Sequence, residues 1–91
     1  MLKIEIFEIK NGNVISEMDT EVEAHIVNLY NKYKDQIQLN KVNIVDKEAM
    51  KKHKDISKHI EKFGVDILPL IKVDGKILEQ SEFIPFIQKK I

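Results

Sequence analysis

The stretch FGVDILPLIKVDGKIL, residues 63–78, decides the fold. Gly64 suits the left-handed conformation that ends many helices, so a helix is expected to stop there. Pro69 lies within the apolar run LPLIKV, which we expect to form a strand. Asp74 and Gly75 favour the tight turn whose twist matches that of two antiparallel strands. The stretch therefore predicts a helix end, a strand, a two-residue turn and a returning strand, KIL.

The chain begins with the pattern of a strand followed by a loop. Residues 2–9 alternate between apolar and charged positions with a period of two, which predicts a strand. One face carries Leu2, Ile4 and Ile6, and the other carries Lys3, Glu5 and Phe7. Residues 10–18 are loop-like, and Asn11-Gly12 is a turn signal.

A helix is expected to start at Asp19 or Thr20. Thr20 and Glu23 have the spacing of a capping box, in which each side chain satisfies a free backbone amide of the other residue. One helical face carries an apolar stripe that consists of Val22, Ile26, Leu29 and Tyr33.

Residues 37–45 predict a second strand. Leu39 and Val42 are three positions apart, so a regular strand would place them on opposite faces. This pattern indicates a bulge or a loose edge. Asp46 can cap the following helix, and a break in that helix is expected near Lys54-Asp55. The helix carries an apolar stripe made of Ala49, His53, Ile56, Ile60 and Phe63.

The C-terminal residues predict a last helix. Ser81 is expected to cap it, and Pro85 is placed in its first turn, where the missing N–H costs little. Its apolar positions are Phe83, Ile84, Ile87 and Ile91.

These elements follow the order β-α-β-α-β-β-α in a single domain, residues 1–91. A helix between two strands favours a parallel pair with a right-handed crossover, whereas a short Asp-Gly turn forces an antiparallel pair. The expected fold class is therefore α/β, with a mixed four-stranded sheet packed by helices.

The composition excludes several classes of function. The chain has 15 basic and 15 acidic side chains, so no global field draws it to nucleic acid or lipid. It has no cysteine, which removes disulfides, thiolate metal sites and thiol-disulfide oxidoreductase activity. No apolar run approaches the roughly 20 residues that span a bilayer, and the N-terminus lacks the continuous apolar segment of a signal peptide. We expect a cytoplasmic protein that is not an enzyme and carries no cofactor.

The order of elements resembles that of thioredoxin-like proteins and, more closely, that of the arsenical-resistance trans-acting repressor and metallochaperone family, ArsD. The matching residues are KIEIF at 3–7, DTEV at 19–22, VNI at 42–44 and GVDILPLIKVDGKI at 64–77. The likeness covers nearly the whole chain in order and length. It implies a thioredoxin-like fold and a cis peptide bond between Leu68 and Pro69.

The resemblance also implies a role that this chain cannot perform in full. In that family, cysteines in the loop after the first strand hold trivalent arsenic or antimony for delivery to an efflux ATPase. Family members are also described as weak homodimeric repressors that bind operator DNA. The corresponding segment here, residues 9–18, has no sulfur except Met18. Because soft trivalent metalloids require thiolates, we expect no metalloid binding.

Two places are candidate binding sites for a peptide or protein. The loop at Leu68 and Pro69 can present backbone groups to an extended peptide by strand addition. The turn formed by Asn11, Gly12 and Asn13 can bind an anion or a peptide through backbone amides. The alternative at both places is a connecting segment that only shapes a turn.

The histidines do not predict a metal site. His53 and His59 are six residues apart and therefore about 120° apart around a helix, and His25 belongs to another helix. His53 lies on an apolar stripe, where a packed, hydrogen-bonded side chain is expected. His59 is expected to form a surface pair with Asp55.

A run of lysines is the only sequence feature that favours nucleic acid, because clustered cations bind phosphates. The chain has no arginine, which supplies the commonest specific base contact, and acidic residues interrupt the run. The candidate nucleic-acid-binding residues are Lys51, Lys52, Lys54, Lys58 and Lys62.

Phe7 and Val27 lie off the main apolar faces, which leaves two alternatives. They pack on the far side of a two-faced sheet, or they are buried in a homodimer. We expect a non-redox, cysteine-less, ArsD-like protein that acts as a protein-binding or regulatory module for an unidentified protein or peptide partner. The alternative is a DNA-binding transcriptional regulator that has lost metalloid sensing.

Overall fold

A four-stranded mixed sheet with the strand order β4-β1-β5-β6 organises the computed structural model, which describes residues 2–15 and 17–90. The strands are β1 (Leu2–Glu8), β4 (Ile37–Asn43), β5 (Leu70–Val73) and β6 (Lys76–Leu78). β1 pairs with β4 in parallel and with β5 in antiparallel orientation, and β5 pairs with β6 in antiparallel orientation. The expected mixed α/β sheet is confirmed.

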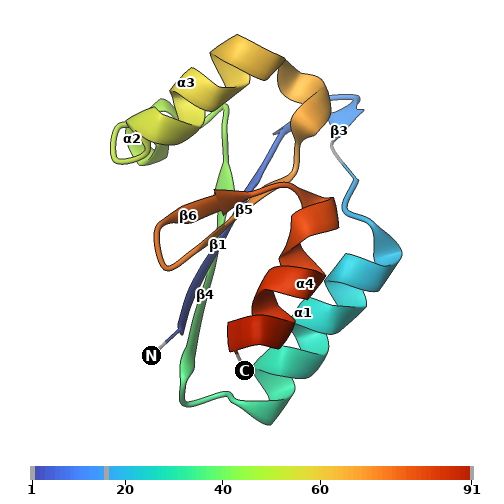
Figure 1. Ribbon diagram of the computed structural model, residues 1–91. Helices are drawn as coiled ribbons and strands as arrows, with labels where there is room; N and C mark the ends of the chain where they lie inside the picture. The colour runs from blue at the N-terminus through green and yellow to red at the C-terminus, as the bar shows by residue number, and fades with distance from the viewer. Residues whose placement is uncertain (1, 16, 91) are drawn as a thin grey trace.

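Helices cover both faces of this sheet (Figure 1). One face is covered by α1 (Thr20–Lys32) and α4 (Gln80–Lys90), and the other by α2 (Lys47–Met50) and α3 (Lys54–Phe63). A short 3₁₀ turn, η1 (Val65–Ile67), leads from α3 into β5. Residues 10–18, expected to be a loop, contain a small hairpin made of β2 (Lys10–Asn11) and β3 (Val14–Ile15).

The parallel pairing of β1 and β4 runs in continuous register from Leu2 and Ile37 to Glu8 and Asn43. The bulge expected in β4 is therefore absent from this register. Leu39 packs into the core under α1 and α4, whereas Val42 packs into the core under α2 and α3. The different parity of these two residues reflects a strand whose two faces are both covered. β4 does lie at an edge of the sheet, which was the alternative to a bulge in the sequence-based prediction.

The turn between β5 and β6 has the predicted geometry. Asp74 has a φ of 48° and Gly75 a φ of 89°, the positive values that a two-residue hairpin turn with this twist requires. The Asp74 N–H donates to the Lys3 carbonyl at 2.9 Å, which ties the turn to β1. At the other end of β5, the peptide bond between Leu68 and Pro69 is cis.

The helix starts differ in part from the predictions. Asp19, rather than the Thr20 and Glu23 pair, caps α1, and its carboxylate accepts hydrogen bonds from the N–H groups of Glu21 and Val22. Thr20 is already the first helical residue, so Glu23 lies one position too late for a capping box. The predicted cap of α2 is confirmed, because the Asp46 carboxylate accepts from the amides of Glu48 and Ala49 at 3.1 and 3.2 Å.

The last helix begins earlier than expected. α4 starts at Gln80, so Ser81 lies inside it and the expected Ser81 cap is wrong. The Glu82 carboxylate instead accepts from the Glu79 amide at 3.0 Å, which is one half of a capping box. Pro85 consequently lies in the second turn, where it removes an intrahelical hydrogen bond, and its ring is exposed. Ile91 lies outside the described residues.

A break separates α2 from α3 at residues 51–53, close to the expected position. His53 is the N-cap of α3, and Gly64, with a φ of 84°, ends α3 as predicted. Phe63, placed on the apolar stripe by its spacing, is the last residue of α3 and is 54% exposed.

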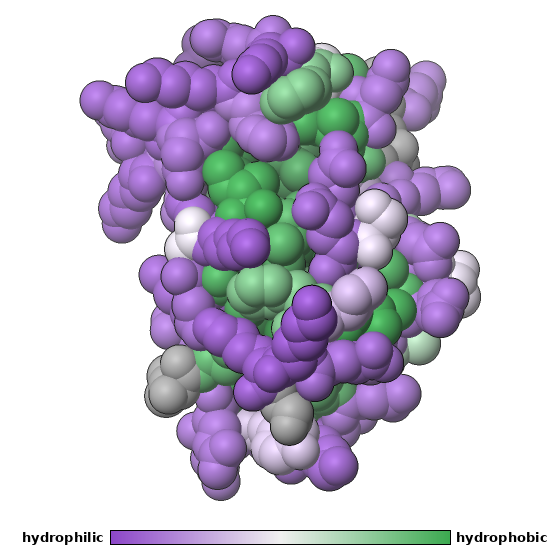
Figure 2. All heavy atoms as spheres, viewed as in Figure 1, coloured by the Kyte–Doolittle hydropathy of each residue, from purple (hydrophilic) through white to green (hydrophobic). Residues whose placement is uncertain are grey.

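Two hydrophobic cores share the sheet. Ile4 and Ile6 face α1 and α4, whereas Phe7 is fully buried on the opposite face with Ile56 and Leu70. Phe7 therefore packs on the far side of a two-faced sheet, whereas Val27 is 50% exposed. Figure 2 shows a hydrophobic band across the middle of one face, between hydrophilic regions above and below it.

Replacing Phe7 with Ala should lower the free energy of unfolding by about 3–5 kcal/mol, because the change leaves a large cavity under α3. Phe63→Ala is the matched control and should cost less than about 1 kcal/mol, because that ring is already half exposed. Urea denaturation followed by circular dichroism measures both. Equal costs for the two variants would contradict the packing described here.

Candidate functional site

The β2–β3 hairpin follows β1 directly and carries one of the two predicted binding segments. Asn11, Gly12 and Asn13 are exposed, and Gly12 has a φ of 61° in the two-residue turn. A glycine with positive φ at the first turn position is typical of a tight hairpin. The predicted turn at Asn11-Gly12 is thus part of an ordered hairpin whose tip faces solvent.

The Asn43 side chain, at the end of β4, links the hairpin to the sheet. The Asn43 amide group donates to the Lys10 carbonyl at 2.9 Å, and its oxygen accepts from the Lys10 N–H at 3.2 Å. The same oxygen accepts from the Val45 N–H at 3.3 Å. Asn43 therefore acts like a backbone peptide group that extends the β1–β4 ladder. Sequence reasoning missed this role, because Lys10 and Asn43 are 33 positions apart.

The second predicted binding segment lies inside the fold. Leu68 is 7% exposed, and the Pro69 side chain is fully buried. The Leu68 N–H donates to the Val65 carbonyl at 3.1 Å, so this amide is already used within the chain. Of the two predicted segments, only the hairpin offers exposed side chains to a partner.

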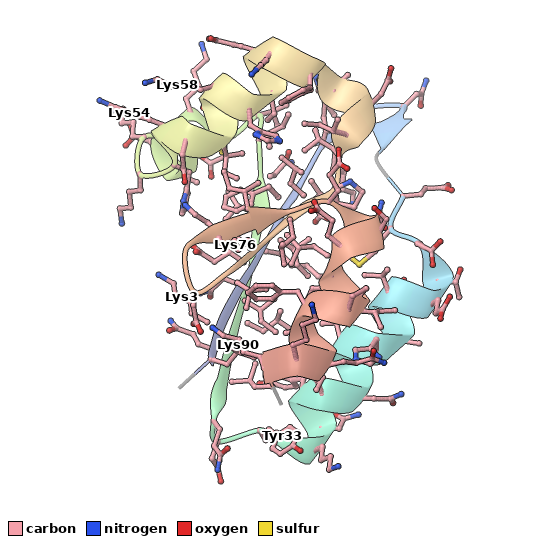
Figure 3. The ribbon with its side chains drawn as sticks, in the orientation of Figure 1. Lys3, Tyr33, Lys54, Lys58, Lys76 and Lys90 are labelled. Atoms are coloured by element: carbon pink, nitrogen blue, oxygen red, sulfur yellow. The ribbon has the colours of Figure 1, made fainter. Side chains whose placement is uncertain are left out.

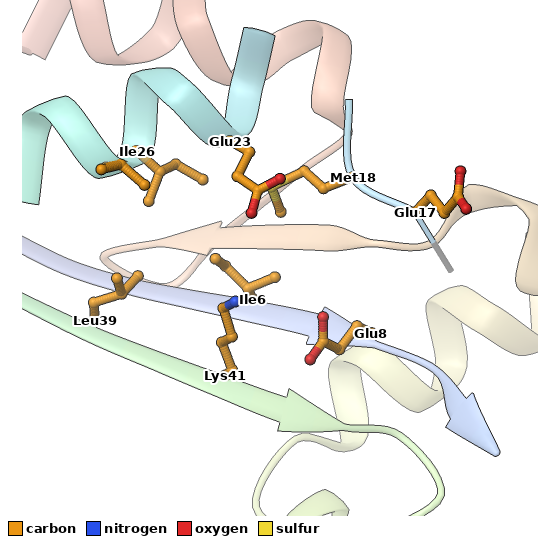
Figure 4. Close-up of a pocket in the computed structure, with 9 residues that line it drawn as sticks. Ile6, Glu8, Glu17, Met18, Glu23, Ile26, Leu39 and Lys41 are labelled. Atoms are coloured by element: carbon orange, nitrogen blue, oxygen red, sulfur yellow. The ribbon is translucent and has the colours of Figure 1, made fainter. Parts of the chain in front are cut away.

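A cavity of about 460 Å³ lies beside residues 17–18, where the carboxyl ends of β1 and β4 meet the start of α1. Figure 4 shows the side chains of Glu8, Glu17 and Glu23 around this cavity, with Lys41 and Met18 among them. Among the described residues that line it, only Met18 carries sulfur, and a thioether cannot replace the thiolates that trivalent arsenic requires. The charged side chains that line the cavity can therefore form polar contacts with a ligand, but none of them is a thiolate that could bind a soft metalloid.

The five candidate lysines differ in their surroundings. Lys51 pairs with Glu48 at 3.0 Å, and Lys62 lies 5.3 Å from the centre of the Phe63 ring. Figure 3 shows Lys54 and Lys58 extending from α3 into solvent. Lys52 lines a cleft on the sheet face instead.

A second group of lysines, outside the five candidates, surrounds the β5–β6 turn. Lys90 pairs with Asp74 at 2.8 Å, and Lys76 lies 5.0 Å from the Phe86 ring centre. Figure 3 shows Lys3, Lys76 and Lys90 on the same side of the molecule. Their positions in the chain are far apart, so only the fold brings them together.

The histidines have different surroundings. His53 is packed, as expected, with its ring edge-to-face on Phe7 at 4.8 Å and its Nε2 atom 3.6 Å from the Glu5 carboxylate. Its Nδ1 atom is buried and has no hydrogen-bond partner among residues 2–15 and 17–90, so the expected hydrogen bond is not found at that atom. His59 does not pair with Asp55 but lies 4.8 Å from the Phe63 ring.

Asp55 pairs with Lys72 instead, because the α2–α3 break places the start of α3 above β5. The Lys72 ammonium lies 2.6 Å from the Asp55 carboxylate. Partial burial acts to raise the pKa of Asp55, but the hydrogen bonds from Lys72 and from the Ile56 amide outweigh it, so the pKa lies below its usual value of 3.8. Hydrogen bonds from Lys90 and the Lys3 amide likewise lower the pKa of Asp74.

Within the described part of the chain, no group of three or more histidine, aspartate or glutamate side chains is arranged to hold a metal ion. No helix in the same residues is long and apolar enough to cross a bilayer.

These features belong to a small α/β protein with an ordered hairpin after its first strand and no thiol. Residues 1–88 match the family described as arsenical resistance operon protein ArsD, so the chain belongs to the ArsD family. Among curated proteins, none matches this chain.

Replacing Asp55 with Asn should lower the free energy of unfolding at pH 7 by about 0.2–1 kcal/mol, the range for partly exposed ion pairs. The folded-state pKa of Asp55 is depressed, so its stabilisation is present above pH 3.8 and is lost as the pH falls through the folded-state pKa. The difference between wild type and Asp55→Asn should therefore shrink in acid. Urea titrations at several pH values measure it, and Asp66→Asn on the exposed η1 turn is the control. A difference that grows in acid would contradict the Asp55–Lys72 pair.

Proposed function

We propose that this ArsD-family chain is a non-catalytic protein-binding or regulatory module with a thioredoxin-like fold that has no part in thiol chemistry. The observation that carries the proposal is the β2–β3 hairpin, which replaces a thiol-bearing loop with an ordered, exposed turn. Asn43 fixes its base through two hydrogen bonds to Lys10. A preorganised turn loses little conformational entropy when it binds, so it suits recognition by a protein surface.

The sheet supports the same proposal. The antiparallel β5–β6 hairpin, the parallel β1–β4 pair and the helices on both faces follow the order expected for a thioredoxin-like protein. In the family that the chain resembles, the loop after the first strand carries the metalloid-binding cysteines, so this segment is the expected place of a binding surface. Here it offers Asn11 and Asn13 to solvent as hydrogen-bonding groups.

Asn13→Arg should abolish the binding of a protein partner, because it adds bulk and charge at the tip of the hairpin. Asn31→Arg makes the same change on the exposed side of α1 and should leave binding unchanged. Affinity capture from lysate identifies the partner, and calorimetry with the purified partner then compares wild type with the two variants. Equal affinities for the three proteins would exclude the hairpin as the binding surface.

Titration with arsenite separates this proposal from a metallochaperone role. Without a thiolate, the amide NMR spectrum should stay unchanged as arsenite is added. Saturable shifts around Met18 would contradict the proposal, because they would show metalloid binding without cysteine.

The second candidate function is a DNA-binding transcriptional regulator that has lost metalloid sensing. The observation that favours it is the exposure of Lys54 and Lys58 on one side of α3, four residues apart (Figure 3). Side chains at this spacing share a helix face and can contact neighbouring phosphates.

If the chain binds DNA, fluorescence anisotropy with its own promoter duplex should show affinity that falls steeply with salt. Replacing both Lys54 and Lys58 with Ala should make the slope of log affinity against log salt shallower by roughly 2, because each phosphate that a lysine neutralises contributes about 0.9 to that slope. Lys32→Ala with Lys34→Ala, at the end of α1, is the control. No binding at low salt would exclude this function.

A further inference from the structure

A cleft of about 560 Å³ opens on the sheet face that α2 and α3 cover only in part. Its floor is a row of residues on three neighbouring strands, because Asn40 and Lys72 both lie directly opposite Glu5 in the sheet register. Residues directly opposite one another point to the same face of a sheet. The next row on this face is apolar and consists of Val42, Phe7 and Leu70.

Two polar groups of this cleft have unused hydrogen-bonding capacity. The Glu5 side chain is 9% exposed, and its nearest cationic atoms are His53 Nε2 at 3.6 Å and Lys3 Nζ at 4.0 Å. Both distances are too long for a strong hydrogen bond. His53 Nδ1 is also buried without a partner among the residues that the structure describes. Because buried polar groups in folded proteins are nearly always hydrogen bonded, this pattern indicates a place for a polar ligand.

The charges that line the cleft favour a negatively charged ligand. Lys3, Lys52 and Lys72 line it, against a single glutamate. Lys72 is already paired with Asp55 at 2.6 Å, whereas Lys52 is exposed and has no ion pair in the described part of the chain. Lys52 is thus free to bind an anion, and Lys3 makes only a long ion pair in the described part of the chain, with Glu5 at 4.0 Å.

Glu5 restricts which anion can enter. A buried carboxylate repels an anion that only accepts hydrogen bonds, but it stabilises one that donates a hydrogen bond to it. A tetrahedral oxyanion that keeps one hydroxyl group meets both requirements, because its hydroxyl donates to Glu5 while its other oxygens accept from lysines.

We propose that this cleft binds a small tetrahedral oxyanion that retains a hydroxyl group, with hydrogen phosphate as the simplest example. The hydroxyl donates to the Glu5 carboxylate, and Lys3 and Lys52 neutralise the remaining oxygens. Sulfate and a phosphodiester have no such hydroxyl at neutral pH, so the cleft excludes them. This site is distinct from the hairpin and from the lysines of α3, and it does not depend on the proposed function.

NMR titrations of the full chain at pH 7.5 test the proposal with inorganic phosphate, sulfate and dimethyl phosphate at matched ionic strength. Phosphate should produce saturable shifts at the amides of Glu5, His53 and Lys72, and the other two anions should not. Equal shifts with phosphate and sulfate, or phosphate shifts confined to other residues, would overturn it.

Variants test the roles of the individual side chains. Lys52→Ala should weaken phosphate binding roughly threefold to tenfold, because an exposed charge contributes a modest share of the affinity. Lys34→Ala, at an exposed lysine that does not line the cleft, should leave it unchanged. Equal losses from the two variants would place the binding elsewhere.

Glu5→Gln distinguishes a selective site from a general basic surface. The amide of glutamine donates as well as accepts, so sulfate should bind this variant about as well as phosphate does. If the variant still rejects sulfate, Glu5 does not select the ligand and the proposal fails. If Glu5→Gln does not fold, the comparison of Lys52→Ala with Lys34→Ala and the sulfate comparison on wild type decide the question.

Discussion

The structure depends on the burial of β1 on both faces and along both edges. Ile4 and Ile6 are 1% and 2% exposed under α1 and α4, and Phe7 is fully buried under α3. Each core contains too few side chains to stabilise a domain alone, and small domains are marginal for this reason. A strand that supplies both cores couples them, so the two helical layers form around the same backbone. The other strands are placed by their register with β1.

Much of this arrangement could be predicted because its causes are local in the chain. Asp74-Gly75 specifies its turn by conformational preference, Asp46 caps the helix that follows it, and Gly64 ends α3 with a positive φ. Asp19 and Thr20 are neighbours that can both cap a helix, so the sequence did not decide between them. In the structure, Asp19 caps α1. The parity of Leu39 and Val42 was misread as a bulge, because alternation cannot distinguish an irregular strand from one covered on both faces.

The polar sites could not be predicted, because their members meet only across strands. Glu5 and Lys72 are opposite each other in the sheet, and His53 reaches Glu5 from the link between two helices. In the sequence, Glu5 is one charged residue in an alternating strand and His53 one position on an apolar stripe. Asn43 is equally inconspicuous, although it holds the hairpin. The absence of cysteine, in contrast, needed no structure and removes thiol-based metalloid chemistry from a member of this family.

The position of β4 has a geometric consequence for any self-association. The two edges of the sheet are unequal, since β4 has seven residues and β6 has three. Backbone groups on an open edge can pair with a strand of another molecule, and the longer edge offers more of them. Two copies joined antiparallel along β4 would form one continuous sheet with two-fold symmetry. The symmetry would place the two Asn43-anchored hairpins at opposite ends. If the hairpin binds a partner as proposed, such a dimer would be bivalent, and its avidity would depend on the spacing of the partner's sites.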